Sequence, residues 1–141
     1  METAAKKAIT VETDVKAPVE KVWKCWTEPR HITGWAFASD DWHAPAAEND
    51  VRKGGKFNTK MAAKDGSAAF DFAGVYTNIQ PNKLIEYTIE DGRKVSINFA
   101  TKGNMTHITE TFEAESVNPI EMQKGGWQAF LDNFRKYTEK Q

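Results

Sequence analysis

Apolar residues recur at steps of three and four near the C-terminal end of the chain. This spacing places them on one face of a helix, which we predict over residues 118–138. Asn118 is a good N-cap, Pro119 suits the first helical position, and Glu121 completes a capping box. The apolar stripe consists of Trp127, Phe130, Leu131, Phe134 and Tyr137.

Two adjacent glycines, Gly125 and Gly126, lie inside this predicted helix. Each costs roughly 1 kcal/mol relative to alanine in a helix interior. One interpretation is a tolerated weakness or a kink. The other is that side-chain bulk is avoided where the helix faces a cavity or a neighbouring backbone.

Near the N-terminus, apolar and polar residues alternate from Ile9 to Val15, which is typical of a half-buried strand. A helix is predicted to begin at Pro18, with Val22 and Trp26 on its apolar face. A second, shorter helix is expected over residues 29–34. Residues 35–50 form either a loop or a short strand.

From residue 51 onward the chain alternates with period two through a series of strands separated by turn signals. The inward sets are Phe57, Thr59 and Met61; Phe70, Phe72, Gly74 and Tyr76; Ile85, Tyr87 and Ile89; Val95, Ile97 and Phe99; and Thr106, Ile108, Glu110 and Phe112. The turns are Asp65-Gly66, Pro81-Asn82, Asp91-Gly92 and Gly103-Asn104. Gly54-Gly55 is interpreted as a bulge or bend.

These elements predict an α+β fold. Short turns make neighbouring strands antiparallel, which gives a curved sheet of about six or seven strands. One sheet face is aromatic, and the C-terminal helix is the element long enough to cover it. We expect a flexible tail over residues 1–8 and a single domain over residues 9–141.

Composition narrows the function classes. The net charge of −1 provides no basic field for nucleic acid, and no segment approaches the 18 apolar residues needed for membrane insertion. Cys25 is the single cysteine, which excludes an internal disulfide and fits a reducing compartment. No signal peptide is recognisable, so a cytoplasmic protein is expected, as a monomer or weak dimer.

Glu110 is the most informative polar residue. If Thr106, Ile108 and Phe112 point inward, period two also carries Glu110 inward. A buried carboxylate must be paired, hydrogen-bonded or protonated. Glu110 is therefore either a structural carboxylate with a buried partner or a group that acts as acid or base, or anchors a ligand.

The remaining candidates for chemistry are weaker. His31, His43 and His107 are not spaced as metal ligands, so neither metal nor cofactor is expected. His107 should point away from Glu110 and lie at the surface, whereas His31 and His43 could stand at the mouth of a pocket. Cys25 is interpreted as inert core filling.

Nine short stretches resemble one known family. They are APVEKVW at 17–23, EPRHITGW at 28–35, DWH at 41–43, GGKF at 54–57, DGS at 65–67, FDFAGVY at 70–76, DGR at 91–93, ETF at 110–112 and GW at 126–127. Their order resembles the START-related superfamily, also called SRPBCC or polyketide-cyclase/lipid-transfer. The subgroup is that of bacterial proteins similar to the activator of the heat-shock protein 90 ATPase. This resemblance implies a helix-grip fold, in which an antiparallel sheet curves around a long C-terminal helix and often holds a hydrophobic ligand.

Three functions remain open. The first is non-catalytic binding of a small hydrophobic or amphipathic molecule between sheet and helix. The second is a cyclase-like or dehydratase-like enzyme that uses Glu110 as acid or base. The third is a protein-interaction factor that contacts a chaperone, as a heat-shock protein 90 activator does.

The expected lining of the pocket combines inward aromatic residues of the sheet with the stripe of the C-terminal helix. It consists of Trp35, Trp42, Phe57, Met61, Phe70, Phe72, Tyr87, Phe99, Glu110, Trp127, Phe130 and Phe134.

Overall fold

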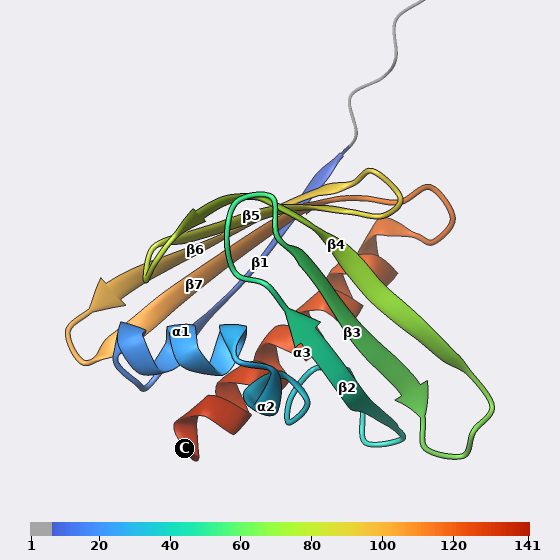
Figure 1. The fold of residues 1–141 in the computed structure, drawn as a ribbon, viewed down its shortest axis with the longest axis horizontal. Helices are drawn as coiled ribbons and strands as arrows, with labels where there is room; N and C mark the ends of the chain where they lie inside the picture. Colours follow the sequence, from blue (N-terminus) through green and yellow to red (C-terminus); the bar gives the residue numbers. More distant parts are fainter. Residues whose placement is uncertain (1–6) are drawn as a thin grey trace, which may run out of the picture.

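A computed structural model describes residues 7–141, and residues 1–6 of the expected tail lie outside the described residues. The chain forms seven strands and three helices (Figure 1). In chain order these are β1 (Ala8–Val15), α1 (Val19–Thr27), α2 (Pro29–Ile32), β2 (Trp42–Asn49), β3 (Lys56–Ala63), β4 (Ala69–Gln80), β5 (Leu84–Ile89), β6 (Lys94–Lys102), β7 (Met105–Glu113) and α3 (Ile120–Glu139).

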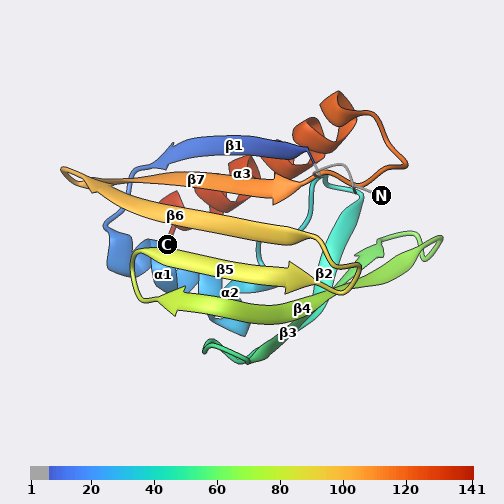
Figure 2. The ribbon, with the colours of Figure 1, turned by 90° about the horizontal axis from the view of Figure 1, so that it is seen from above.

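The strands form one antiparallel sheet in the order β1-β7-β6-β5-β4-β3-β2. Strands β2 to β7 follow one another as a meander, and β1 is added beside the last of them. The sheet curls, and all three helices lie on its concave side (Figures 1 and 2). The predicted α+β fold with a curved sheet and a covering C-terminal helix is confirmed.

Period-two alternation decides which side chains face the helices. Along β7, Thr106, Ile108, Glu110 and Phe112 are buried, while the residues between them are partly exposed. On β1, Val11 lies opposite Glu110 and is likewise buried. The predicted inward direction of Glu110 is therefore correct.

The C-terminal helix begins at Ile120 with Pro119 as its N-cap, so the prediction of an Asn118 cap and a capping box is wrong. The Asn118 side chain instead donates to Glu115 Oε2 at 3.0 Å. Gln123 fixes the helix entry, because its amide nitrogen donates to the Asn118 carbonyl at 2.7 Å and its oxygen accepts from the Glu115 amide. One buried glutamine thus replaces the expected reciprocal cap.

Residues 35–50 were expected to form either a loop or a short strand. The strand is correct for β2 (Trp42–Asn49). This strand lies at the sheet edge and contains Pro45 within a shift of register between His43 and Ala46, as expected for proline in a sheet. The predicted bend follows at Gly54-Gly55. Gly54 has φ +83°, and a Cβ at Gly55 would lie 2.0 Å from the Asp50 carbonyl oxygen.

The two helical glycines are not required by close packing. A Cβ at Gly125 or Gly126 would meet no atom within 4 Å, which excludes a neighbouring backbone as the reason for them. Gly74 on β4 differs, because a Cβ there would lie 2.4 Å from the Thr88 carbonyl oxygen and 2.9 Å from the Phe57 ring. The absence of a side chain at Gly74 therefore lets the Phe57 ring lie close to the backbone of β4.

Among residues 7–141, no helix is both long enough and apolar enough to cross a membrane.

Candidate functional site

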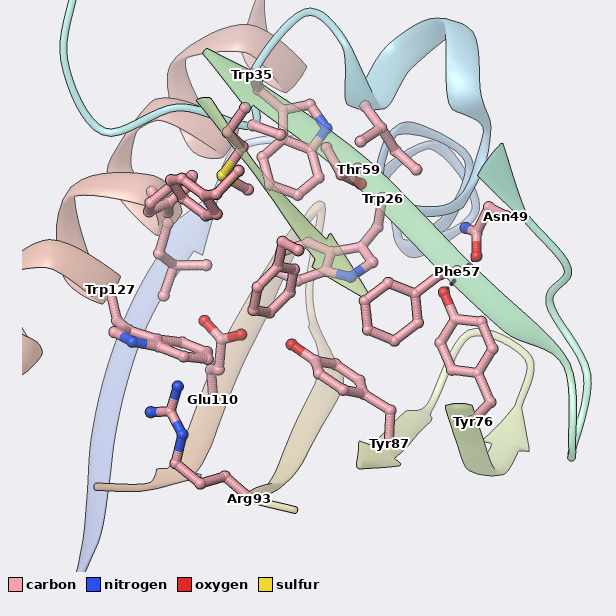
Figure 3. A pocket seen from close by; sticks show the side chains of 17 residues that line it. Trp26, Trp35, Asn49, Phe57, Thr59, Tyr76, Tyr87, Arg93, Glu110 and Trp127 are labelled. Carbon is pink, nitrogen blue, oxygen red and sulfur yellow. Dashed lines mark hydrogen bonds between the residues drawn. The ribbon is translucent and has the colours of Figure 1, made fainter. Parts of the chain in front are cut away.

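A cavity of about 290 Å³ lies between the concave face of the sheet and the helices (Figure 3). It is mainly apolar and aromatic, with a few polar groups. Its lining consists of Trp26, Ile32, Trp35, Ala36, Asn49, Phe57, Thr59, Met61, Phe70, Phe72, Tyr76, Tyr87, Arg93, Glu110, Trp127, Phe130 and Leu131.

The sheet side of the cavity is a set of interlocked rings. Phe57 on β3 meets Tyr87 on β5 edge to face, with ring centroids 4.8 Å apart. Phe72 on β4 lies 6.2 Å from Tyr87 and 6.2 Å from Trp127 on α3. These edge-to-face contacts hold each ring in place and form firm walls.

Trp127 forms the helix side of the same wall. Its indole stacks on Phe112 of β7, with centroids 3.9 Å apart and planes within 9° of parallel. Trp127 is only partly buried, and it also lines the cavity. One face of the Trp127 indole is thus covered by Phe112, and the part of the ring that borders the cavity remains available to a ligand.

Glu110 is the central polar group of the cavity. Its exposed fraction is 5%, and its carboxyl makes no hydrogen bond or ion pair with any residue from 7 to 141. Burial without a partner disfavours the charged form and raises the pKa of Glu110 to about 8. The carboxyl is therefore largely protonated at neutral pH and can donate a hydrogen bond.

Two further polar groups point into the same end of the cavity (Figure 3). The Tyr87 hydroxyl has no hydrogen-bond partner in the described part of the chain, and burial raises its pKa well above 10. Arg93 lies in the turn between β5 and β6, where its Nε donates to Asp91 Oδ2 at 2.8 Å. Its Nη1 donates to the Glu113 carbonyl at 3.4 Å.

Two other polar side chains of the lining, Tyr76 and Asn49, already have partners. The Tyr76 hydroxyl donates to Asn49 Oδ1, and the Asn49 amide nitrogen donates to the Thr27 carbonyl at 2.7 Å. Burial raises the pKa of Tyr76, so its hydroxyl stays neutral. Among the titratable and charged groups of the lining, unused hydrogen-bonding capacity thus remains at Glu110, Tyr87 and Arg93.

Most of the residues expected to line a pocket do line this cavity. They are Trp35, Phe57, Met61, Phe70, Phe72, Tyr87, Glu110, Trp127 and Phe130. Their role in ligand binding stays a prediction.

Trp42, Phe99 and Phe134 do not line the cavity, so their placement there was wrong. Phe99 and Phe134 are covered by Trp26, whose ring centroid lies 5.8 Å and 4.7 Å from theirs. Trp42 packs beside Phe70 at 5.8 Å, near the hairpin of β3 and β4. The face assignment was correct for Phe99 and Phe134, but a helix side chain fills the space above them.

Several lining residues were missed by sequence reasoning. Trp26 and Leu131 were assigned to the core, and Arg93 lies in a turn where strand periodicity gives no direction. The others were Ile32, Ala36, Asn49, Thr59 and Tyr76. Thr59 and Tyr76 belonged to predicted inward sets, and that signal could have identified them.

The histidines do not contribute to this cavity. His31 Nδ1 lies 2.7 Å from the Tyr137 hydroxyl, and neither His31 nor His43, the two candidates for a pocket mouth, is among the lining residues. His107 lies 3.0 Å from Glu12 and 2.7 Å from Asp14 on the outer side of β7. Within residues 7–141, no three His, Cys, Asp or Glu side chains gather as metal ligands.

Cys25 is buried as a free thiol, and desolvation raises the pKa of this thiol. A raised thiol pKa lowers the fraction of thiolate at neutral pH, which agrees with a core role.

Comparisons with solved structures identify close relatives in fold. The solution structure of an AHSA1-like protein from Aeromonas hydrophila is 40% identical, with a TM-score of 0.90 over 95% of this chain and 93% of that chain. A solution structure from Cytophaga hutchinsonii is 57% identical, with a TM-score of 0.81 over 94% of this chain and 92% of that one.

A protein from Nitrosomonas europaea shares the fold at 19% identity, with a TM-score of 0.83 over 99% of both chains. Among curated proteins, no match is found. The family model described as Activator of Hsp90 ATPase homolog 1-like protein matches residues 16–139. The chain therefore belongs to this AHSA1-like family, within the SRPBCC superfamily.

Proposed function

We propose that this protein binds a small hydrophobic or amphipathic molecule in the cavity between sheet and helices. One observation carries the proposal: an aromatic cavity of about 290 Å³ contains a buried carboxyl, Glu110, that has no partner among residues 7–141. Apolar walls with a few polar groups are typical of small-molecule sites.

The energetics support a ligand at this position. Burying a polar group without a hydrogen bond costs about 1–3 kcal/mol in proteins. Glu110 and the Tyr87 hydroxyl both incur such a cost in the free protein, and a ligand group between them would recover part of it. An apolar residue at position 110 would serve stability better, which favours a binding role for the carboxyl.

The geometry also suggests how a ligand enters. Phe70 lines the cavity, yet its exposed fraction is 50%. It therefore marks the opening, on the hairpin of β3 and β4. A ligand that enters there would leave its polar end at Glu110 and its apolar body among the rings.

A direct test combines discovery of the ligand with a matched pair of variants. Native mass spectrometry of protein from its own host would reveal co-purified molecules. Titration with fatty acids, flavonoids and aromatic polyketide-like compounds, followed by tryptophan fluorescence and amide shifts, would measure binding. Saturable changes confined to the cavity residues support the proposal.

The variants use Thr59, a buried lining residue. Thr59→Phe fills the cavity and should abolish binding, whereas Thr59→Val keeps the volume and should retain it. If no compound class binds the wild type and nothing co-purifies, the proposal fails. An interaction protein of the chaperone-activator kind would then become the better hypothesis.

A second candidate is an enzyme that uses Glu110 as acid or base on the bound molecule. The supporting observation is the pKa of about 8, which makes both protonation states accessible near neutral pH. Product analysis of bound ligands tests it. An enzyme requires turnover by the wild type and none by Glu110→Gln, while ligand binding by that variant persists.

A further inference from the structure

We infer that the ligand of this cavity carries a carboxylate, which lies between Arg93 and Glu110, on a compact ring body. This inference rests on the proposed binding function and adds the chemical class of the ligand. Its basis is the arrangement of donors and charge at one end of the cavity.

Arg93 is held in place with part of its donor capacity unused. Its Nε donates to Asp91 and its Nη1 to the Glu113 carbonyl, at 2.8 Å and 3.4 Å. Its side chain is 16% exposed and lines the cavity. These bonds use the Nε and Nη1 groups, and neither partner residue lines the cavity. The guanidinium is therefore oriented by the protein, while a planar edge of N–H donors remains for an acceptor.

Arg93 and Glu110 point into the same end of the cavity but do not pair (Figure 3). In the described part of the chain, no ion pair within 4.0 Å joins them, and the raised pKa of Glu110 results from burial alone. The space between them can therefore take a ligand group. The Tyr87 hydroxyl, which has no hydrogen-bond partner among the described residues, is the third polar group at this place.

The surroundings of Glu110 determine the charge that fits. Tyr87 from β5 and Arg93 from the β5–β6 turn are the titratable or charged side chains that share its end of the cavity. The other elements packed against it present apolar groups: Val11 of β1, Ile97 of β6 and Trp127 of α3.

With Glu110 protonated, Arg93 carries the one charge among the side chains that line this end of the cavity, because Asp91, which pairs with its Nε, is not a lining residue. Every group there can donate a hydrogen bond: Glu110 and Tyr87 through O–H, and Arg93 through N–H. A cation would approach the guanidinium against its positive charge, and a neutral alcohol forms no charge-assisted pair with it. A carboxylate accepts from the planar guanidinium edge that faces the cavity, which matches its geometry. A phosphate dianion would exceed the single positive charge.

The size of the cavity limits the rest of the molecule. Its volume of about 290 Å³ lies at the lower end of the usual range for ligand pockets, roughly 300–1,000 Å³. The walls are flat rings such as Phe57, Phe72 and Trp127. A molecule with one or two rings fits these walls better than a long acyl chain.

Matched probes test the inference. Naphthalene and biphenyl bodies are each prepared with a carboxylate, a carboxamide, a hydroxyl or a methylammonium group, and their affinities are measured by calorimetry. We expect the affinity of the carboxylates to exceed that of the carboxamides by about 10-fold or more, because a charge-assisted hydrogen bond is stronger than a neutral one. The ammonium compounds should bind most weakly.

Variants assign this preference to its residue. Arg93→Met should remove the advantage of the carboxylate, so that carboxylate and carboxamide probes bind this variant within about 2-fold of each other. Arg52→Met is the matched control. Arg52 also pairs with an aspartate two residues earlier, at 2.9 Å, but is 70% exposed and does not line the cavity. Its removal should change no affinity.

Glu110 gives a second, independent readout. Above about pH 8 its carboxyl ionises in the free protein, so carboxylate affinity should fall by up to about 10-fold per pH unit. Glu110→Gln cannot ionise, and its carboxylate affinity should stay constant between about pH 7 and about pH 9. Carboxamide probes should show no comparable decline in either protein.

The outcomes separate the inference from the function on which it rests. If hydroxyl, carboxamide or ammonium probes bind as well as the carboxylates, the inference is wrong and the binding function stands. The same holds if Arg93→Met leaves the preference unchanged. If no probe binds, and nothing co-purifies with the protein, both fail together.

Discussion

The space between sheet and helices has a solid region and a hollow one, built from the same kinds of residues. In the solid region, Phe134 of α3 is fully buried. Its ring centroid lies 4.7 Å from that of Trp26 and 4.9 Å from that of Trp35, with interplanar angles of 66° and 80°. Trp26 also lies 5.8 Å from Phe99 of β6. Helix α1 carries Trp26 and the chain just after α2 carries Trp35, and both rings lie over the sheet and fill the space.

In the hollow region, Trp127 of α3 stacks on Phe112, and the cavity lies beside the pair. There Glu110 and Tyr87 of the sheet have no hydrogen-bond partner within residues 7–141. The alternation of the strands is the same in both regions. The difference is that Trp26 of α1 and Trp35 after α2 pack directly against Phe99 or Phe134 in the solid region, whereas they only border the cavity in the hollow region. A solid core and a binding cavity can therefore share one sheet face.

The largest effect is expected in the solid region. Phe134→Ala should lower the free energy of unfolding by about 3–5 kcal/mol, as for other fully buried phenylalanines. The reason is that the tryptophans around it are held by their own contacts; Trp35 Nε1, for example, donates to the Cys25 carbonyl at 2.8 Å. Urea denaturation followed by circular dichroism measures the change.

Phe70→Ala is the matched control, because Phe70 is a phenylalanine that is half exposed at the cavity opening. It should cost less than about 1 kcal/mol. Equal losses for both variants would contradict the division into a solid and a hollow region.

The next effect concerns Glu110 and pH. The folded protein holds the proton of Glu110 more tightly than the unfolded chain, since its pKa is about 8 rather than 4.5. Stability is therefore lost as pH rises from the unfolded to the folded value, by about 1.4 kcal/mol per pH unit. At pH 7 the loss reaches about 3 kcal/mol.

Glu110→Gln removes this titration. The difference in unfolding free energy between variant and wild type should grow in favour of the variant from about pH 5 to about pH 8, and then level off. Urea denaturation across this range measures it. A difference that does not change with pH would show that Glu110 is paired or hydrated in the folded protein.

The fold was predictable because its signals are local. Period two along β7 placed Glu110 on the inner face, and Asp-Gly and Gly-Asn turns fixed the antiparallel neighbours. The start of α3 was not predictable in detail, because Gln123 reaches back to Asn118 in place of a capping box. That contact depends on the path of the preceding loop, which no period describes.

The site was predictable only as a face. Alternation puts Phe99 and Phe72 on the same side of the sheet, but it does not show which of them lies beneath Trp26. Arg93 was missed because it lies in a turn, where the backbone path determines the side-chain direction. Which strand residue is covered by a helix side chain, and where a turn side chain points, both depend on tertiary packing. A single sequence does not show that packing.

A smaller loss of stability is expected at the hollow region. Trp127→Ala should lower the free energy of unfolding by about 1–2 kcal/mol, less than the usual value for a buried tryptophan, because the cavity already borders its ring. The loss comes mainly from the stacking contact with Phe112. Thermal and urea denaturation measure it, and ligand titration should show weaker binding.

The effects of Trp127→Ala on stability and ligand affinity are to be compared with those of Phe134→Ala. Phe134→Ala should reduce stability strongly and ligand affinity weakly, and Trp127→Ala should do the reverse. If Trp127→Ala costs as much as Phe134→Ala, the cavity does not relieve the packing of α3, and the two regions are energetically alike.

The smallest effect tests the glycines of α3, which lie on the half of the helix that carries Trp127. Gly125 is exposed, and a Cβ there would meet no atom within 4 Å, so neither packing nor the cavity requires a glycine. Gly125→Ala should therefore stabilise the protein by about 0.5–1 kcal/mol through helix propensity alone, and leave ligand affinity unchanged.

Gly74→Ala is the opposing control, because its Cβ would overlap the Thr88 carbonyl and the Phe57 ring. This substitution should destabilise the protein by about 1–3 kcal/mol. A loss of stability or of binding in Gly125→Ala, measured by denaturation and ligand titration, would mean that this half of α3 must bend or open as the cavity fills. The hollow region would then be maintained by a weak helix as well as by the absence of covering side chains.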